Sequence, residues 1–170
     1  MKRIILIKAI SQENSSNSKA GKSLTMTHHD VQKTHDLAHF INDSNLQPDN
    51  IVSGGDYNVL FTSFILAREL GVDFFNIKKV VYSGGGVLKP LETIATQYSY
   101  DNSVLLVVEN SLFKEILTHY VLNIDEVSLF SEQMLFLNFS CDNWPETLYS
   151  QPHIIPGNLD NYNSERKDIA

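Results

Sequence analysis

The stretch Arg3-Ile4-Ile5-Leu6-Ile7-Lys8-Ala9-Ile10-Ser11 decides the fold. Four consecutive apolar residues, three of them β-branched, are followed by polar sequence without a hydrophobic period. A short, unbroken apolar run of this kind is typical of a strand buried on both faces, as in the centre of a parallel sheet. Ligands bind at the carboxyl ends of such strands in open α/β sheets. We therefore expect the residues from Lys8 to Ser11 to lie at the functional edge.

The rest of the chain alternates between apolar runs and helical patterns. Further parallel strands are predicted at 50–53, 78–83 and 104–108, and helices at 24–42, 57–70, 88–98 and 112–122. Thr25 or Thr27 can cap the first of these helices, and Gly71 is a natural end for the second. This alternation predicts helices on both faces of a mainly parallel sheet.

The pattern changes in the C-terminal part of the chain. A strand at 133–139, a turn at 141–145 and a partner strand at 147–150 predict a hairpin, and hence an antiparallel edge. We therefore predict one α/β domain over residues 1–157: a three-layer α/β/α arrangement whose central sheet is mainly parallel, with an antiparallel C-terminal hairpin at its edge. The polar segment 158–170 has no period and is expected to be a disordered tail.

Composition narrows the function further. A chain of 170 residues is long enough for one ordinary core. Its net charge of -7 and the lack of a basic stripe argue against binding nucleic acid through phosphates. The single Cys141 cannot form an intramolecular disulfide. The N-terminus does not read as a signal peptide, and no apolar run reaches the roughly 18 residues that span a bilayer. We expect a cytoplasmic protein without membrane partners.

Several landmarks fall in a recognisable order. These are Lys8-Ala9-Ile10 after the first strand, Leu24-Thr25 before the first helix, Ser53 ending the second strand, Thr62-Ser63 and Leu70-Gly71 in the next helix, and Leu105–Ser111 at the fourth parallel strand. In order and spacing they resemble the histidine phosphatase superfamily, or phosphoglycerate-mutase-like fold, and within it the small bacterial phosphohistidine phosphatases. The resemblance covers nearly the whole chain. It implies that the first and fourth parallel strands lie side by side.

The catalytic positions implied by this resemblance hold other residues. The family's Arg-His-Gly corresponds to Lys8-Ala9-Ile10, so alanine stands at the nucleophilic histidine. The second phosphate-binding arginine corresponds to Asn58, or to Tyr57 if the alignment slips by one, and the second histidine to Glu109. Alanine offers no nucleophile, lysine is a point charge where arginine is bidentate, and a carboxylate repels an incoming phosphoryl group. The resemblance thus implies a degenerate pocket with no catalytic residue.

The function we predict is a catalytically inactive pseudophosphatase that serves as a binding or regulatory module. No cofactor and no metal are expected, and the partner is an unidentified protein or small ligand, bound at the pocket or at the hairpin edge. One alternative is a hydrolase or phosphatase with altered chemistry that uses Lys8 and Glu109. Another is an unrelated doubly wound α/β domain that binds a nucleotide or similar ligand. The candidate ligand-binding residues are Lys8, Ser11, Ser53, Asn58, Glu109 and Asn110.

Three narrower expectations follow from the residues. Lys8 and Glu109 are predicted to form an ion pair, directly or through a water, because the resemblance places both beside one phosphate position. The histidines at 28, 35 and 39 have a spacing that can hold a metal on a helix, but a solvated polar face is the more ordinary reading. The aromatic group at 61, 64, 74 and 75 is expected in the core, whereas the group at 130, 136, 139 and 144 is expected to include an exposed patch near the hairpin.

Overall fold

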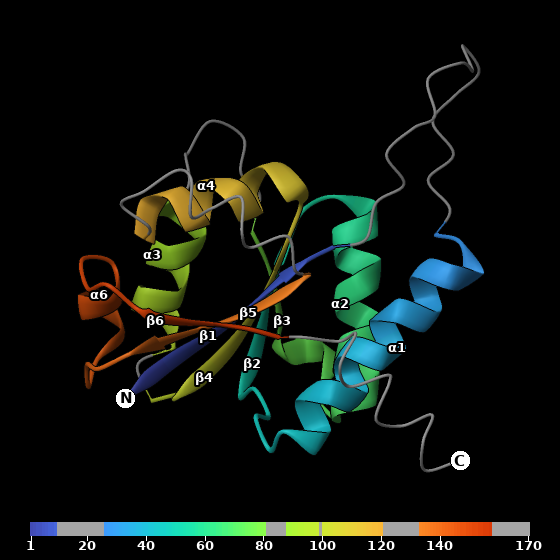
Figure 1. The fold of residues 1–170 in the computed structure, drawn as a ribbon, viewed down its shortest axis with the longest axis horizontal. Coiled ribbons are helices and arrows are strands. Elements are labelled where there is room, and N and C mark those ends of the chain that lie inside the picture. The colour runs from blue at the N-terminus through green and yellow to red at the C-terminus, as the bar shows by residue number, and fades with distance from the viewer. Residues whose placement is uncertain (10–25, 81–87, 99, 121–132, 158–170) are drawn as a thin grey trace.

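The computed structural model describes residues 1–9, 26–80, 88–98, 100–120 and 133–157 (Figure 1). Its centre is a sheet of six strands in the order β3-β2-β4-β1-β5-β6. The strands are β1 (Lys2–Lys8), β2 (Asn50–Gly54), β3 (Ile77–Val80), β4 (Ser103–Val108), β5 (Met134–Phe139) and β6 (His153–Pro156). The first four strands are parallel, β5 is antiparallel to β1, and β6 is antiparallel to β5. The predicted adjacency of the first and fourth strands is confirmed.

Helices cover both faces of this sheet, which confirms the three-layer arrangement (Figure 1). One face packs against α1 (His28–Asp43) and α2 (Tyr57–Leu70). The other face packs against α3 (Leu88–Gln97), α4 (Asn110–Tyr120) and the short α6 (Trp144–Thr147). A 3₁₀ turn, η1 (Phe74–Asn76), joins α2 to β3.

The apolar run of β1 lies at the centre of the molecule, between β4 and β5. Ile4 and Leu6 enter the core on the α3 and α4 side, and Ile5 and Ile7 enter the core on the α1 and α2 side. All four side chains are fully buried. Because each such side chain stabilises the fold by about 1.5–3 kcal/mol when it leaves water, a strand with two buried faces needs an apolar residue at every position.

The ends of the first two helices follow from local sequence. Thr27 caps α1: its side chain accepts a hydrogen bond from the backbone N–H of Asp30, and the Asp30 carboxylate accepts one from the Thr27 N–H in return. Of the two threonines considered, Thr27 is therefore the cap, and Thr25 lies outside the described residues. Gly71 ends α2 with φ of +68°, a left-handed conformation that glycine adopts without steric cost.

The antiparallel edge is confirmed, but its partner strand was predicted in the wrong place. The predicted strand 147–150 is instead the last residue of α6 (144–147) and the turn after it, and the strand paired with β5 is 153–156. The reason is local: Asn143 caps the helix by accepting a hydrogen bond from the N–H of Glu146, and Pro145 stands in the first turn, where its missing N–H costs nothing. The predicted residues 81–83 of the third strand and the predicted tail 158–170 lie outside the described residues.

Trp144 anchors α6 at the amino edge of the sheet. Its indole nitrogen donates to the backbone oxygen of Asp101 (2.8 Å), and the Lys2 ammonium donates to the same oxygen (2.6 Å). That ammonium also lies 5.6 Å from the centroid of the Trp144 ring. Trp144, Phe136 and Phe139 are all buried, so the exposed patch predicted near the hairpin is wrong for these three, and residue 130 lies outside the described range.

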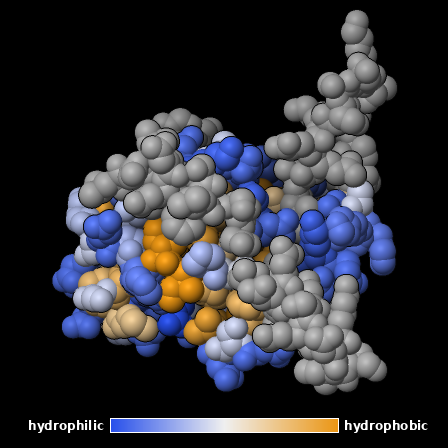
Figure 2. Space-filling view, viewed as in Figure 1, coloured by the Kyte–Doolittle hydropathy of each residue, from blue (hydrophilic) through white to orange (hydrophobic). Residues whose placement is uncertain are grey.

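The surface over β5 and β6 is hydrophobic in part. Figure 2 shows hydrophobic side chains gathered there, and Ile155 of β6 is 42% exposed. Among the described helices, none combines the length and apolar character that crossing a membrane requires.

Candidate functional site

Topology selects one edge of the sheet for ligand binding. The connections after β1 and β2 pass through α1 and α2 on one face, whereas the connection after β4 passes through α4 on the other face. Where neighbouring strands send their connections to opposite faces, their carboxyl ends leave room for a ligand. In this chain that point lies between β1 and β4, with β2 on the far side of β4. We call the residues at these strand ends the carboxyl-edge site: Lys8, Ala9, Ser53, Asn58, Glu109 and Asn110.

Lys8 and Ala9 occupy the end of β1. Lys8 pairs in register with Val108 of β4, and the Ala9 N–H donates to the Val108 oxygen (2.8 Å). The sheet thus sets Ala9 beside the residue that follows β4. The Ala9 methyl group is 4% exposed and belongs to the core beneath α1 and α2. The Lys8 ammonium lies 5.7 Å from the centroid of the Phe113 ring on α4, a cation–π contact.

Glu109 joins β4 to α4. Its backbone oxygen accepts a hydrogen bond from the N–H of Phe113 (2.9 Å), so Glu109 occupies the cap position of the helix. Its carboxylate accepts a hydrogen bond from the Ser111 hydroxyl (2.7 Å) and is exposed. A carboxylate at a helix N-terminus is stabilised by the unpaired N–H groups there. The same position is unfavourable for a second anion, because like charges would meet.

The prediction of a direct ion pair between Lys8 and Glu109 is wrong. Among the described residues, no ion pair joins these two side chains; the Glu109 carboxylate is held by Ser111, and the Lys8 ammonium lies over Phe113. The backbone explains the difference. Glu109 has already left the strand for the first turn of α4, so its side chain bonds locally within that turn.

Ser53 and Asn58 lie at the end of β2 and the start of α2. The Ser53 side chain is fully buried, and its hydroxyl lies 2.8 Å from that of Ser63 on α2. The backbone oxygen of Asn58 accepts a hydrogen bond from Thr62, whereas its side-chain oxygen is buried and lacks a hydrogen-bond partner among the described residues. Asn58 thus retains an unused acceptor, which is the opposite of the donor that an arginine offers to phosphate. Ser11 lies outside the described residues.

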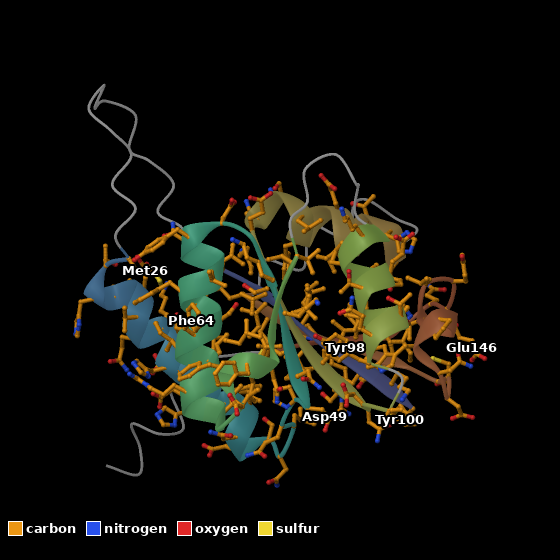
Figure 3. The ribbon with its side chains drawn as sticks, turned by 180° about the vertical axis from the view of Figure 1, so that it is seen from behind. Met26, Asp49, Phe64, Tyr98, Tyr100 and Glu146 are labelled. Carbon is orange, nitrogen blue, oxygen red and sulfur yellow. The ribbon has the colours of Figure 1, made fainter. Side chains whose placement is uncertain are left out.

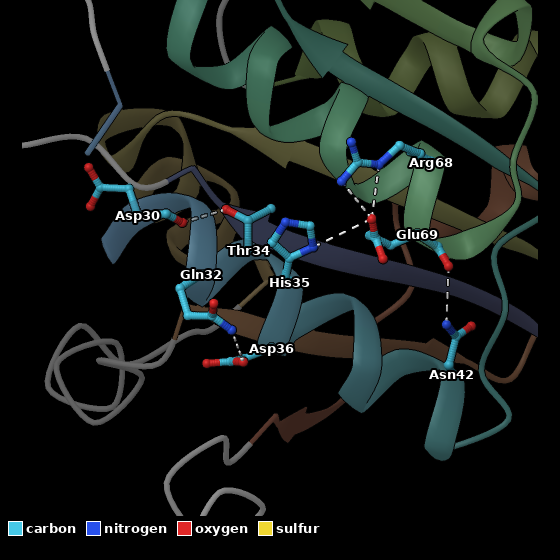
Figure 4. Close-up of polar contacts among 8 residues, drawn as sticks. All are labelled: Asp30, Gln32, Thr34, His35, Asp36, Asn42, Arg68 and Glu69. Atoms are coloured by element: carbon cyan, nitrogen blue, oxygen red, sulfur yellow. Dashed lines mark hydrogen bonds and ion pairs between the residues drawn. The ribbon is translucent and has the colours of Figure 1, made fainter. Parts of the chain in front are cut away.

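The histidines of α1 face the neighbouring helix or solvent. His28 and His39 are exposed. The His35 ring nitrogen Nδ1 lies 3.5 Å from the Glu69 carboxylate of α2, which also accepts hydrogen bonds from Arg68 (Figure 4). The hydrogen bond from Arg68 lowers the pKa of Glu69. Within the described part of the chain, no three His, Cys, Asp or Glu side chains come together as metal ligands would.

The sequence did not predict the local partners of Lys8 and Glu109, which are Phe113 and Ser111. Phe113 is buried in the core, and its ring also contacts the Lys8 ammonium. The Ser111 hydroxyl donates to the Glu109 carboxylate two residues before it. A usable signal exists for Phe113: it lies one helical turn after the residue that follows β4, on the helix that covers the end of β1.

Comparison with known proteins supports the fold alone. Neither a protein-family model nor a curated protein sequence matches the chain. A solved structure assigned as phosphohistidine phosphatase SixA from Nakamurella multipartitia is similar with a TM-score of 0.64 and 14% identity over 91% of this chain and 93% of that one. One assigned to the same protein from Agrobacterium tumefaciens gives 0.57 and 19% identity, over 80% and 90%. Histidine phosphatase SixA complexed with tungstate gives 0.62 and 8% identity, over 91% and 97%.

These likenesses extend over nearly the full length of each protein. Together with the adjacency of β1 and β4, they show that the chain has the fold of the histidine phosphatase superfamily.

Proposed function

We propose that this protein is a pseudophosphatase: a histidine-phosphatase-like domain that does not transfer phosphoryl groups through a histidine and acts as a binding or regulatory module. The observation that carries the proposal is Ala9. It stands at the end of β1 and at the point where the connections diverge, with its methyl group packed into the core. The resemblance of the sequence to the superfamily puts the nucleophile at this position.

The first support is that the described strand ends carry no histidine nucleophile. Covalent phosphotransfer needs a side chain that attacks phosphorus, and an alanine methyl group cannot. No histidine stands in the described segments 8–9, 53–58 and 108–111. The second histidine position of the resemblance holds Glu109, whose carboxylate is engaged by Ser111.

The second support is electrostatic. Phosphatases stabilise the transferred phosphoryl group with arginines, which donate paired hydrogen bonds. Both described arginines lie elsewhere: Arg3 is the second residue of β1, at the opposite edge of the sheet, and Arg68 lies in the last turn of α2. In the three described segments at the carboxyl edge, Lys8 is the one cation, against the carboxylates of Asp56 and Glu109. The local charge therefore opposes a dianionic phosphate.

A hydrolysis assay tests the proposal directly. The purified protein is incubated with a phosphohistidine peptide and, separately, with p-nitrophenyl phosphate. We expect no turnover above the buffer rate. Glu109→Ala tests the altered hydrolase that would use Lys8 and Glu109, and Glu115→Ala is the matched control, since Glu115 is an exposed carboxylate on the same helix. Turnover that Glu109→Ala abolishes and Glu115→Ala retains would refute the pseudophosphatase.

Anion binding gives a second readout that does not depend on turnover. Tungstate is a tetrahedral oxyanion like phosphate, and it is bound in a solved structure of SixA with this fold. A ligand that binds only the folded state raises the melting temperature. We expect tungstate to leave the melting temperature of this protein unchanged, because the arginine donors are missing at the described strand ends. A rise that saturates with tungstate concentration would count against the proposal.

A further inference from the structure

Five aromatic side chains lie in a row on the surface of α2 and η1. Tyr57, Phe61 and Phe64 follow one another at helical spacing, so they share one face of α2. Phe74 and Phe75 continue the row on η1. Their exposed fractions are 55%, 37%, 42%, 50% and 97% in chain order. We call this row the aromatic stripe; Figure 3 labels Phe64 within it. The prediction that the phenylalanines at 61, 64, 74 and 75 belong to the core is therefore wrong.

The core of α2 lies on its other side. Val59, Leu66 and Leu70 pack with α1 and the sheet, and this burial already secures the helix. Within the stripe the rings order one another: Tyr57 stacks on Phe61 at 6.1 Å between centroids, and Phe64 meets Phe74 edge-to-face at 5.8 Å. Large aromatic residues held in place but left in water are typical of interaction surfaces, because they offer contact area at a low entropic cost.

The strand next to the stripe has an open edge. β3 follows η1 directly and is the outermost strand of the sheet, with β2 as its one neighbour among the described strands. It carries Lys78 and Lys79, both exposed and neither in an ion pair with another described residue. Lys79 pairs in register with Ser53, whose hydroxyl meets α2, so Lys79 faces the same side of the sheet as the stripe.

The lysines decide which occupant fits this edge. A second copy that paired through β3 would bring lysines opposite lysines, which is unfavourable, and lysines on edge strands suppress such self-pairing. The carboxylates of an acidic segment would instead gain a complementary charge at Lys78. An extended segment can add to an open strand edge through its backbone while its alternate side chains reach the neighbouring surface.

We propose that β3 and the aromatic stripe bind an extended acidic segment of a partner protein, in which carboxylate side chains alternate with apolar ones. Its backbone pairs with β3. Its carboxylates meet Lys78, which pairs in register with Val52 and therefore faces the side of the sheet opposite the stripe, and its apolar side chains cover the stripe. Apart from Tyr57, which precedes Asn58, this surface lies outside the carboxyl-edge site. The proposal therefore does not depend on the loss of phosphatase activity, and the hydrolysis assay does not bear on it.

Fluorescence anisotropy with a labelled peptide tests the proposal. The probe has about eight residues in which glutamate alternates with leucine, a length that spans one strand. We expect saturable binding that Phe75→Ser and Lys78→Glu each weaken by about tenfold, as for central contacts of an interface. Both side chains are exposed, so neither change removes a core contact. The matched controls are Tyr149→Ser and Lys114→Glu, exposed residues on other elements, and these should bind the probe like the unmodified protein.

Three results would overturn the proposal. The first is no binding of the glutamate peptide by the unmodified protein. The second is equal binding of a peptide in which lysine replaces glutamate, since the partner would then not be acidic. The third is a concentration-dependent dimer in analytical ultracentrifugation that Phe75→Ser dissociates, which would assign the stripe to a second copy of this chain.

Discussion

The hydroxyl groups of Ser53 on β2 and Ser63 on α2 lie 2.8 Å apart, and both side chains are fully buried. Ser53 also lies 3.1 Å from the Gly54 oxygen, and Ser63 lies 2.8 Å from the Val59 oxygen. The pair therefore couples the strand to the helix that follows it, at the carboxyl edge. Its polar atoms are satisfied within the protein, which indicates a positioning role for Ser53.

Removing either hydroxyl should destabilise the protein by about 1 kcal/mol, because the remaining hydroxyl loses a buried partner. The double variant Ser53→Ala/Ser63→Ala should cost less than the sum of the two single variants, since residues in direct contact are not additive. Urea denaturation of the four proteins measures the coupling. Strict additivity would show that the two hydroxyls do not interact in solution.

Restoring histidine at the end of β1 should not restore activity. The methyl group of Ala9 is buried, so Ala9→His should destabilise the fold by roughly 1–3 kcal/mol through overpacking. It should still give no hydrolysis of p-nitrophenyl phosphate, because no arginine stands at the described strand ends. Ser140→His, on an exposed turn, serves as the control for adding an imidazole. Multiple turnover by Ala9→His would show that the rest of the site remains competent.

Alkaline pH should expose the environment of Tyr98. Burial raises its pKa from 10.0 to about 12. The neutral phenol is therefore favoured in the folded protein, and this contribution to stability is complete below pH 10 and is lost as the pH rises towards 12. The stability of the unmodified protein relative to Tyr98→Phe should fall across this window. Tyr100→Phe, which changes an exposed ring, is the control. A stability difference that stays constant from pH 10 to about pH 12 would contradict the assignment.

The contact between α1 and α2 should respond weakly to acid. The hydrogen bond from Arg68 lowers the pKa of Glu69, so the stabilisation is present above the ordinary pKa of the carboxyl group and is lost as the pH falls below it. Because the pair is partly exposed, Glu69→Gln should cost no more than about 0.5 kcal/mol at neutral pH, and less in high salt. Thermal melts at two salt concentrations measure this, with Glu92→Gln on α3 as the exposed control. A loss that salt leaves unchanged would assign the effect to packing.

The sequence was sufficient to predict an element where one physical effect dominates its local structure. The apolar runs of β1 and β4 predicted buried parallel strands, because both faces of those strands are covered by helices. The position of the carboxyl-edge site followed from the same runs. Gly71 and Thr27 marked helix ends through their local chemistry.

The sequence was insufficient where contacts between elements far apart in the chain determine the position of a side chain. The helical spacing of Phe61 and Phe64 predicted an apolar face, but which face of α2 meets the sheet depends on α1. The contact between Lys8 and Phe113 requires knowing that α4 covers the end of β1. The helix at 144–147 could have been predicted locally, since the cap by Asn143 and the early Pro145 are both helix-start signals. The prediction of a hairpin did not take these signals into account.

The central place of β1 has a consequence for the order of events during synthesis. Its neighbours on both sides come from much later in the chain: the side chain of Lys2 bonds residues 99 and 100 positions away, and Arg3 bonds Asn138 across 135 positions. A ribosome therefore releases β1 long before either flanking strand exists. Because closing such long loops is slow, we expect the sheet to assemble only after β5 has emerged. Until then the apolar run of β1 is exposed, and the nascent chain depends on chaperones.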